Sequence, residues 1–143
     1  MSVAQFYGAW KLISYEFRGE SGEVHQPFGA DASGLIMYDP SGMMSVQIIR
    51  NDRMGFASGD MFDATMQELR SVYEGINSYF GTFSVDEAQK TVTHHVIAAS
   101  LPSRHGSDQV RHFEFSGNRL TLKAPARYLK GQMMTGVLVW ERI

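Results

Sequence analysis

Two adjacent histidines, His94 and His95, stand in the segment TVTHHVIAAS (91–100), which otherwise consists of β-branched and small residues. An imidazole that faces a protein interior can act as an acid, as a base or as a hydrogen-bonding partner for a ligand. Side chains that follow one another along a strand point to opposite faces of the sheet. Only one of the two imidazoles can therefore face the interior, unless the strand bulges.

The neighbouring residues decide which histidine faces inward. His94 shares its face with Val92 and Val96, whereas His95 shares its face with threonines such as Thr93. Because the interior face of a half-buried strand is the more apolar one, we predict that His94 faces inward and His95 outward. A bulge would reverse this order and bring His95 to the ligand. An inward His94 could equally be a core histidine whose nitrogens are satisfied by its neighbours.

An arginine is predicted on the interior face of the next strand (108–115), where Arg111 shares its face with Gln109. A buried guanidinium needs a partner, because removing a lone charge from water costs several kcal/mol. Its partner would be Glu16, Glu141 or an acidic oxygen of a ligand, and the sequence leaves these alternatives open.

Alternation along residues 8–18 places Trp10, Ser14 and Glu16 on one face. If Trp10 is buried, Glu16 also lies inside, and a separation of about 3 Å from His94 would favour acid–base chemistry. The residues predicted to do chemistry are therefore His94, Arg111 and Glu16. The further residues predicted to contact a ligand are His95, Gln109, Trp140, Met43, Met44, Gln47, Tyr79, Phe113 and Ser14.

Eight segments have the composition and alternation of strands, and short turns join most of them. They span residues 8–18, 34–38, 43–50, 80–85, 90–99, 108–115, 119–124 and 135–143. Eight antiparallel strands can close into an up-and-down barrel with room for one small ligand. We therefore predict an all-β barrel, with a two-sheet sandwich as the main alternative.

One segment has a helical pattern instead. Thr65 and Glu68 have the spacing of a capping box. Met66, Leu69 and Tyr73 then recur at intervals of three and four residues. We predict one amphipathic helix over about 62–78, inserted between the third and fourth strands, that lies over or plugs one end of the barrel.

The composition indicates a single globular domain over residues 1–143, with 43% hydrophobic and 20% charged residues. The formal net charge of −2, with acids and bases interspersed, gives no basis for binding nucleic acid or an anionic membrane. The chain has no cysteine, which excludes disulfides and cysteine nucleophiles. No segment has the pattern of a secretory signal or a membrane span, so we expect a cytoplasmic protein. The histidines lack metal-site spacing, and we predict no metal and no cofactor.

The segments FYGAWKLISYEFR (6–18), TVTHHV (91–96) and VLVWER (137–142) together resemble the small lipocalin-like domain proteins of bacteria and fungi, a calycin-type family. The resemblance runs through nearly the whole chain. It implies a small barrel with the tryptophan of GAW at its closed end. It also implies a setting in natural-product biosynthesis, where some lipocalin-like barrels act as cofactor-free cyclases or isomerases.

Two functions follow as hypotheses. The first is binding of an apolar small molecule whose acidic or carbonyl oxygen is anchored by Arg111 and His94. The second is a cofactor-free isomerase or cyclase in which His94 shuttles a proton and Arg111 stabilises an enolate. A purely structural or oligomerising domain is the third alternative, and a homodimer is compatible with each.

Overall fold

The computed structural model describes residues 2–143, in which ten strands form one antiparallel sheet. The strands are β1 (Gly8–Gly19), β2 (Val24–His25), β3 (Ser33–Tyr38), β4 (Met43–Ile49), β5 (Ile76–Asp86), β6 (Thr91–Ala99), β7 (Asp108–Ser116), β8 (Arg119–Lys123), β9 (Arg127–Leu129) and β10 (Gln132–Arg142). The helix α1 spans Met66–Glu74, and two 3-10 turns, η1 and η2, span Val3–Gln5 and Pro102–Arg104.

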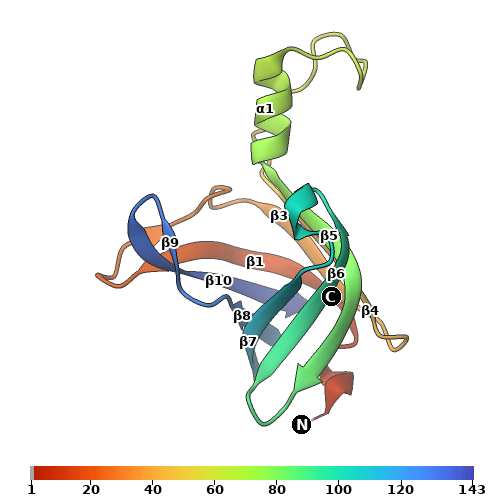
Figure 1. Cartoon of the computed structure of the whole chain (residues 1–143), viewed down its shortest axis with the longest axis vertical. Coiled ribbons are helices and arrows are strands. Elements are labelled where there is room, and N and C mark those ends of the chain that lie inside the picture. The colour runs from red at the N-terminus through yellow and green to blue at the C-terminus, as the bar shows by residue number, and fades with distance from the viewer. Residues whose placement is uncertain (1) are drawn as a thin grey trace.

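The sheet closes on itself into a barrel (Figure 1). Its strands follow in the order β1-β3-β4-β5-β6-β7-β8-β10, and β10 pairs with β1. The short strands β2 and β9 extend this barrel beside β1 and β10. The predicted eight-stranded antiparallel barrel is therefore confirmed. The long ladder between β1 and β10 excludes the two-sheet sandwich, because a sandwich leaves its edge strands unpaired.

The helix is shorter than predicted and has a different place in the strand count. It ends at Glu74, because Gly75 follows as its C-terminal cap and β5 begins at Ile76. The apolar spacing of residues 76–80 fits a strand as well as a helix, and pairing with β4 decides for the strand. The helix follows the fourth strand of the chain, not the third, since the sequence reading missed the short strand β2.

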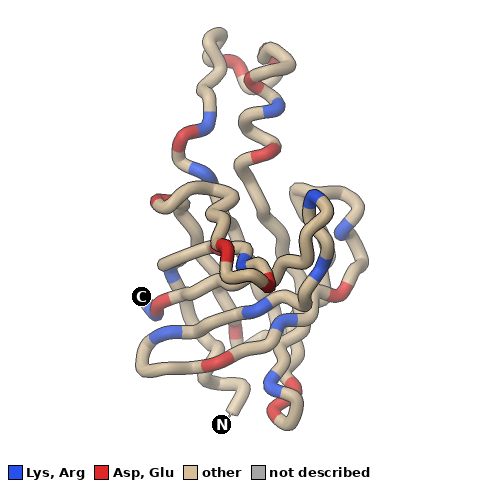
Figure 2. The backbone as a smooth tube through the Cα atoms, turned by 90° about the vertical axis from the view of Figure 1, so that its left-hand side faces the viewer, with Lys and Arg blue, Asp and Glu red and all other residues tan. Residues whose placement is uncertain are grey.

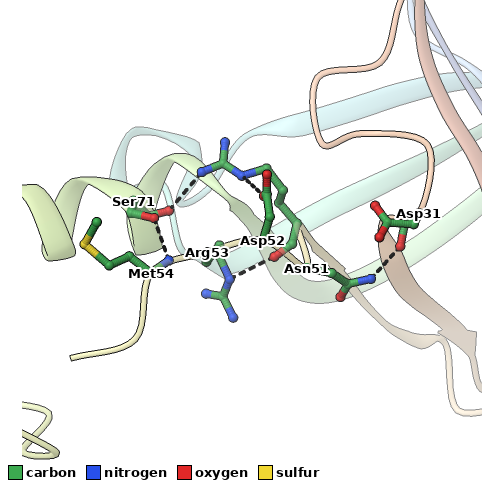
Figure 3. Close-up of polar contacts among 7 residues, drawn as sticks. Asp31, Asn51, Asp52, Arg53, Met54 and Ser71 are labelled. Atoms are coloured by element: carbon green, nitrogen blue, oxygen red, sulfur yellow. Dashed lines mark hydrogen bonds and ion pairs between the residues drawn. The ribbon is translucent and has the colours of Figure 1, made fainter. Parts of the chain in front are cut away.

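The helix does not cover or plug the barrel. It points away from the barrel as the last part of the long connection between β4 and β5, and a loop lies beyond it (Figure 1). Only its last turn, with Tyr73, borders the barrel opening. The side chains of Met61, Phe62 and Met66 are exposed in this connection. Polar contacts at the base of this connection hold it in place: the Met54 amide donates to Ser71 Oγ at 2.9 Å, and an Arg50 guanidinium nitrogen contacts Asp52 at 2.8 Å (Figure 3).

The predicted capping box of α1 is confirmed. Thr65 Oγ1 accepts from the Glu68 amide, and the Glu68 carboxylate accepts from the amides of Thr65 and Ala57. These backbone hydrogen bonds hold the pKa of Glu68 below its ordinary value.

Replacing Thr65 with alanine is expected to destabilise α1 by about 1 kcal/mol, because one amide of the first turn loses its acceptor. Amide hydrogen exchange in residues 66–74 should accelerate, while exchange in the barrel strands stays as in the wild type. Equal acceleration of exchange in the helix and in the barrel would contradict the expectation that the substitution affects α1 alone.

One end of the barrel is closed by aromatic packing. The Phe6 ring packs edge-on against Tyr38, Phe113 and Phe115, with centroid distances of 5.0–5.2 Å. The indole of Trp10 donates to the Phe6 carbonyl at 2.9 Å. Both side chains are fully buried, so the space that remains in the barrel lies toward its other end.

Candidate functional site

A bulge in β1 changes which residues of that strand face the interior. The pairing with β10 shifts register between Leu12 and Ser14, which leaves Ile13 as the extra residue. Trp10 and Leu12 face inward before the bulge, and Tyr15 and Phe17 face inward after it.

This bulge corrects the predicted positions of Ser14 and Glu16. Both residues lie on the outer face, and the Glu16 carboxylate accepts a hydrogen bond from Arg18 at 2.9 Å. Glu16 therefore does not meet His94. Simple alternation failed here because it holds only along an unbroken strand.

The predicted orientation of the two histidines is confirmed. His94 has 1% of its surface exposed and lies with Val92 and Val96 in the core, whereas the His95 side chain is 41% exposed. A bulge does occur in β6, but it falls at Ile97, beyond both histidines, and leaves their faces unchanged.

Two tyrosines enclose the imidazole of His94. The Tyr38 hydroxyl lies 2.7 Å from Nε2, and the Tyr79 hydroxyl lies 2.6 Å from Nδ1. Burial lowers the pKa of His94 to about 3, with smaller contributions from the positive charge of Arg111 and from His95. The imidazole is therefore neutral at pH 7. This disfavours the predicted proton shuttle, which requires an imidazolium near neutral pH.

A cavity of about 50 Å³ lies beside these residues. Its polar lining consists of three arginines, two tyrosines, one asparagine, His94 and one tryptophan, with no aspartate or glutamate. These residues are Arg104, Arg111, Arg127, Tyr15, Tyr79, Asn77, His94 and Trp140. Aliphatic and aromatic side chains such as Ile36, Val46 and Phe17 complete the walls. A mostly apolar pocket with a few convergent polar groups is the usual form of a small-molecule site.

Arg111 is a cation of this cavity, and burial lowers its pKa from the ordinary value. Its guanidinium donates to the Val110 carbonyl at 2.8 Å and to Gln109 Oε1 at 3.3 Å. It forms no ion pair with any residue among 2–143. Both carboxylates predicted as its partners are engaged elsewhere, Glu16 with Arg18 and Glu141 with Arg119. The positive charge of Arg111 is therefore not neutralised by the described chain.

A groove of about 180 Å³ adjoins the cavity and shares Tyr15, Asn77 and Arg104 with it. Its other lining residues are mainly apolar: Phe28, Tyr73, Ile76, Ser100 and Leu101. Arg104 donates to Asn77 Oδ1 at 2.9 Å, at the junction of the two spaces. The groove places the open side of the site between the end of α1, the beginning of β5 and the turn η2.

The remaining predicted ligand contacts divide into three groups. Trp140 and Tyr79 line the cavity, while Phe113 and Met44 are buried in the core away from it. Gln109 contacts the cavity only through Arg111. Met43 is exposed, and Gln47 lies on the outer face, where it donates to Ser45 at 2.7 Å.

Sequence reasoning missed several residues of the site. Tyr38 could have been found from its spacing of two from Ile36 in the segment GLIMY, since both face inward. Tyr15 depends on the bulge in β1, and Arg104 and Arg127 lie in a turn and a short strand. No periodic signal in the sequence points to these three residues.

A second polar cluster lies on the outer face of the barrel. His95 Nε2 lies 2.9 Å from Ser84 Oγ, and His95 Nδ1 lies 2.8 Å from Asp108. The order of a hydroxyl, an imidazole and a carboxylate matches that of a hydrolase triad. Ser84, His95 and Asp108 lie on the paired strands β5, β6 and β7, where the cluster is exposed. We therefore interpret this cluster as a surface hydrogen-bond network.

Charged residues of both signs are distributed over the whole tube of residues 2–143 (Figure 2). Within this range, no three histidine, aspartate or glutamate side chains gather where they could hold a metal ion. No helix of the same range is long and apolar enough to cross a membrane.

A family model described as a lipocalin-like domain matches residues 7–143, which is nearly the whole chain. No curated protein matches the sequence.

Proposed function

Since the chain belongs to the lipocalin-like domain family, whose barrel is compatible with ligand binding, we propose that it binds an apolar small molecule with an acidic or carbonyl oxygen. The observation that carries this proposal is the charge of the cavity. Three arginines line it and no carboxylate does, and Arg111 has no ion-pair partner in the described chain. An unpaired cation in a partly buried site is stabilised when a ligand supplies the negative charge.

The two connected spaces suggest how such a ligand lies. Its oxygen sits beside Arg111 and Tyr79 in the inner cavity. This cavity has room for only a few atoms. Its apolar part extends into the outer groove, against Phe28 and Leu101. The small inner volume favours a single ring or a short chain over a bulky hydrocarbon, since pockets for drug-sized ligands usually measure about 300–1,000 Å³.

Octanoate and octanamide test this proposal, because they differ in the charge of the head group and share the same chain. We expect octanoate to bind at least about 10-fold more tightly, since a charge-assisted hydrogen bond contributes about 1.5–3 kcal/mol. The affinities would be measured by NMR shift titration, with the shifts expected in residues that line the cavity and the groove.

The variant Arg111→Leu should weaken octanoate binding by about 10- to 100-fold and octanamide binding by less, because the amide carbonyl makes a hydrogen bond without a charge to pair. Arg119→Leu is the matched control, because Arg119 is exposed and pairs with Glu141 outside the cavity. Equal binding of the two compounds, with no effect of Arg111→Leu, would contradict an anion-binding cavity.

A cofactor-independent isomerase or cyclase is the second candidate, favoured by the Tyr79 hydroxyl and the Arg111 guanidinium, which both line the cavity. Such a pair can stabilise the negative oxygen of an enolate. Native mass spectrometry on protein purified from its own host separates the candidates. A binder retains an organic mass that Arg111→Ala releases, whereas an enzyme is isolated without its product.

A further inference from the structure

We propose that the buried Tyr38, acting through His94, orients the Tyr79 hydroxyl as a hydrogen-bond donor into the cavity, so that the site selects an ionised oxygen: a phenolate, an enolate or a carboxylate. This inference rests on the proposed function, because it specifies the chemical form of the ligand bound in the same cavity.

The first observation is the isolation of Tyr38. Its side chain is 1% exposed, and its ring packs against Phe6 and Phe83, with centroid distances of 5.2 and 4.8 Å. The hydroxyl has one hydrogen-bond partner among the described residues, His94 Nε2 at 2.7 Å. Tyr38 does not line the cavity, whereas Tyr79 does. The two hydroxyls on either side of the imidazole therefore have different surroundings.

The hydrogens of this chain can be arranged in two ways, because a neutral imidazole has one N–H donor and one acceptor nitrogen. In the first arrangement Tyr38 donates to Nε2, Nδ1–H donates to the Tyr79 oxygen, and the Tyr79 hydrogen points to the cavity. In the second arrangement Tyr79 donates to Nδ1 and Nε2–H donates to the Tyr38 oxygen. The Tyr38 hydrogen then points into apolar surroundings without an acceptor.

The first arrangement is favoured, because a buried donor without an acceptor is costly and, among the described residues, the Tyr79 hydroxyl borders the cavity whereas the Tyr38 hydroxyl does not. Burial raises the pKa of both tyrosines, which keeps both hydroxyls protonated at neutral pH. Tyr38 is thus a positioning residue that touches no ligand, and Tyr79 is the group that contacts the ligand oxygen.

Most of the other polar groups of the cavity are also donors, the Tyr15 hydroxyl and the Asn77 carbonyl being the exceptions that can accept. Arg111 presents its guanidinium, and the buried Trp140 Nε1–H has no hydrogen-bond partner in the described chain. The Asn77 carbonyl oxygen accepts from Arg104. A protonated acid or alcohol would bring a further hydrogen into a cavity that offers donors. An ionised oxygen brings only acceptor lone pairs and a negative charge, and it can therefore accept hydrogen bonds from the donors of the cavity.

Nitrogen-15 NMR of the histidine side chains tests the orientation without a ligand. The His94 signals are identified by their absence in the variant His94→Gln. We expect Nδ1 to have the chemical shift of a protonated nitrogen and Nε2 that of a hydrogen-bonded, unprotonated nitrogen. Tyr38→Phe should move the Nε2 signal toward that of an unbonded lone pair. A protonated Nε2 in the wild type would overturn the proposed orientation.

Binding of 4-nitrophenol, with 4-nitroanisole as the neutral analogue, tests the selection of the ionised form. The wild type is expected to bind the phenolate at least about 10-fold more tightly than the anisole. Preferential binding of the phenolate would be detected as phenolate absorbance at a pH below that at which free 4-nitrophenol ionises. Tyr79→Phe should weaken phenolate binding by about 10-fold or more and leave anisole binding unchanged.

The outcomes separate this inference from the proposed function. If the phenolate binds through Arg111 but Tyr79→Phe has no effect, the cavity binds anions and the role of Tyr79 is wrong. If neither 4-nitrophenolate nor octanoate binds, both proposals fail.

Discussion

The wild-type protein is expected to lose stability steeply between pH 6.5 and pH 5, and the variant His94→Gln to lose much less. The pKa of His94 is about 3 in the folded protein, against an ordinary value of 6.5. Between these values the unfolded chain binds a proton that the folded protein excludes. The free energy of unfolding then falls by about 1.4 kcal/mol for each pH unit of acidification.

The sign follows from the direction of the shift. Well above pH 6.5, from about pH 7.5, the imidazole is neutral in both states and contributes almost no pH dependence. As the pH falls from 6.5 toward 3, protonation favours the unfolded chain, and the lost stability approaches about 5 kcal/mol if the barrel remains folded that far. Urea denaturation at pH 7.5, 6.5, 5.5 and 5.0 would measure the slope in each variant.

His112→Gln is the matched control for this experiment, because His112 is an exposed histidine of β7. It should keep the wild-type slope. Because the wild type and the two variants have the same carboxylates, a difference between their slopes reflects the substituted histidine. Equal slopes for the wild type and His94→Gln would mean that the folded protein accepts a proton at His94, and the imidazole would again be available as an acid or base in an enzyme.

The same residue illustrates what the sequence could predict. The inward orientation of His94 followed from alternation, because β6 is regular from Thr91 to Val96. The barrel itself followed from eight alternating segments joined by short turns. In both cases the pattern reflects burial of one sheet face, which is the strongest constraint on a strand.

The errors fall where local geometry breaks the pattern. A single extra residue, Ile13, exchanged the predicted Ser14 and Glu16 for Tyr15 and Phe17 on the cavity wall. Composition could not locate this bulge, because all neighbouring residues are compatible with a strand. The helix was predicted too long for a similar reason: apolar residues at 76–80 suit either period, and only the partner strand β4 distinguishes them.

The positive charge of the site was found only in part. Arg111 lies on a regular strand, and alternation predicted its position. Arg104 lies in the turn η2 and Arg127 in the short strand β9. Their arrival at one cavity is a property of barrel closure, which brings together residues distant in the chain. Reading the sequence strand by strand therefore identifies arginines as candidate residues, but it cannot show that these arginines meet at one cavity.

The variant Gly81→Ala is expected to destabilise the barrel by about 3–5 kcal/mol, the range typical of the most damaging single substitutions. A Cβ atom at this position would overlap the His95 carbonyl oxygen and lie 2.8 Å from its carbon. The obstacle is backbone, so a side-chain rotation cannot relieve it. Strands β5 and β6 would have to separate where the bulge at Ile97 brings them close.

Gly55→Ala is the control, because no heavy atom lies within 4 Å of a Cβ built there and its backbone needs no special conformation. Its free energy of unfolding in urea should change by less than about 0.5 kcal/mol. If Gly81→Ala were equally mild, the close contact between β5 and β6 would not be required for stability.

The substitution Gly81→Ala should also affect the cavity, since Tyr79 precedes Gly81 by two residues on β5 and pairs with Ala99 just beyond the bulge. Any shift between the strands moves the Tyr79 hydroxyl relative to His94, a contact of 2.6 Å on which the orientation of the ligand-facing hydrogen depends. In the folded fraction of Gly81→Ala we therefore expect weaker binding of 4-nitrophenolate. Wild-type affinity in that fraction would show that the bulge serves stability alone.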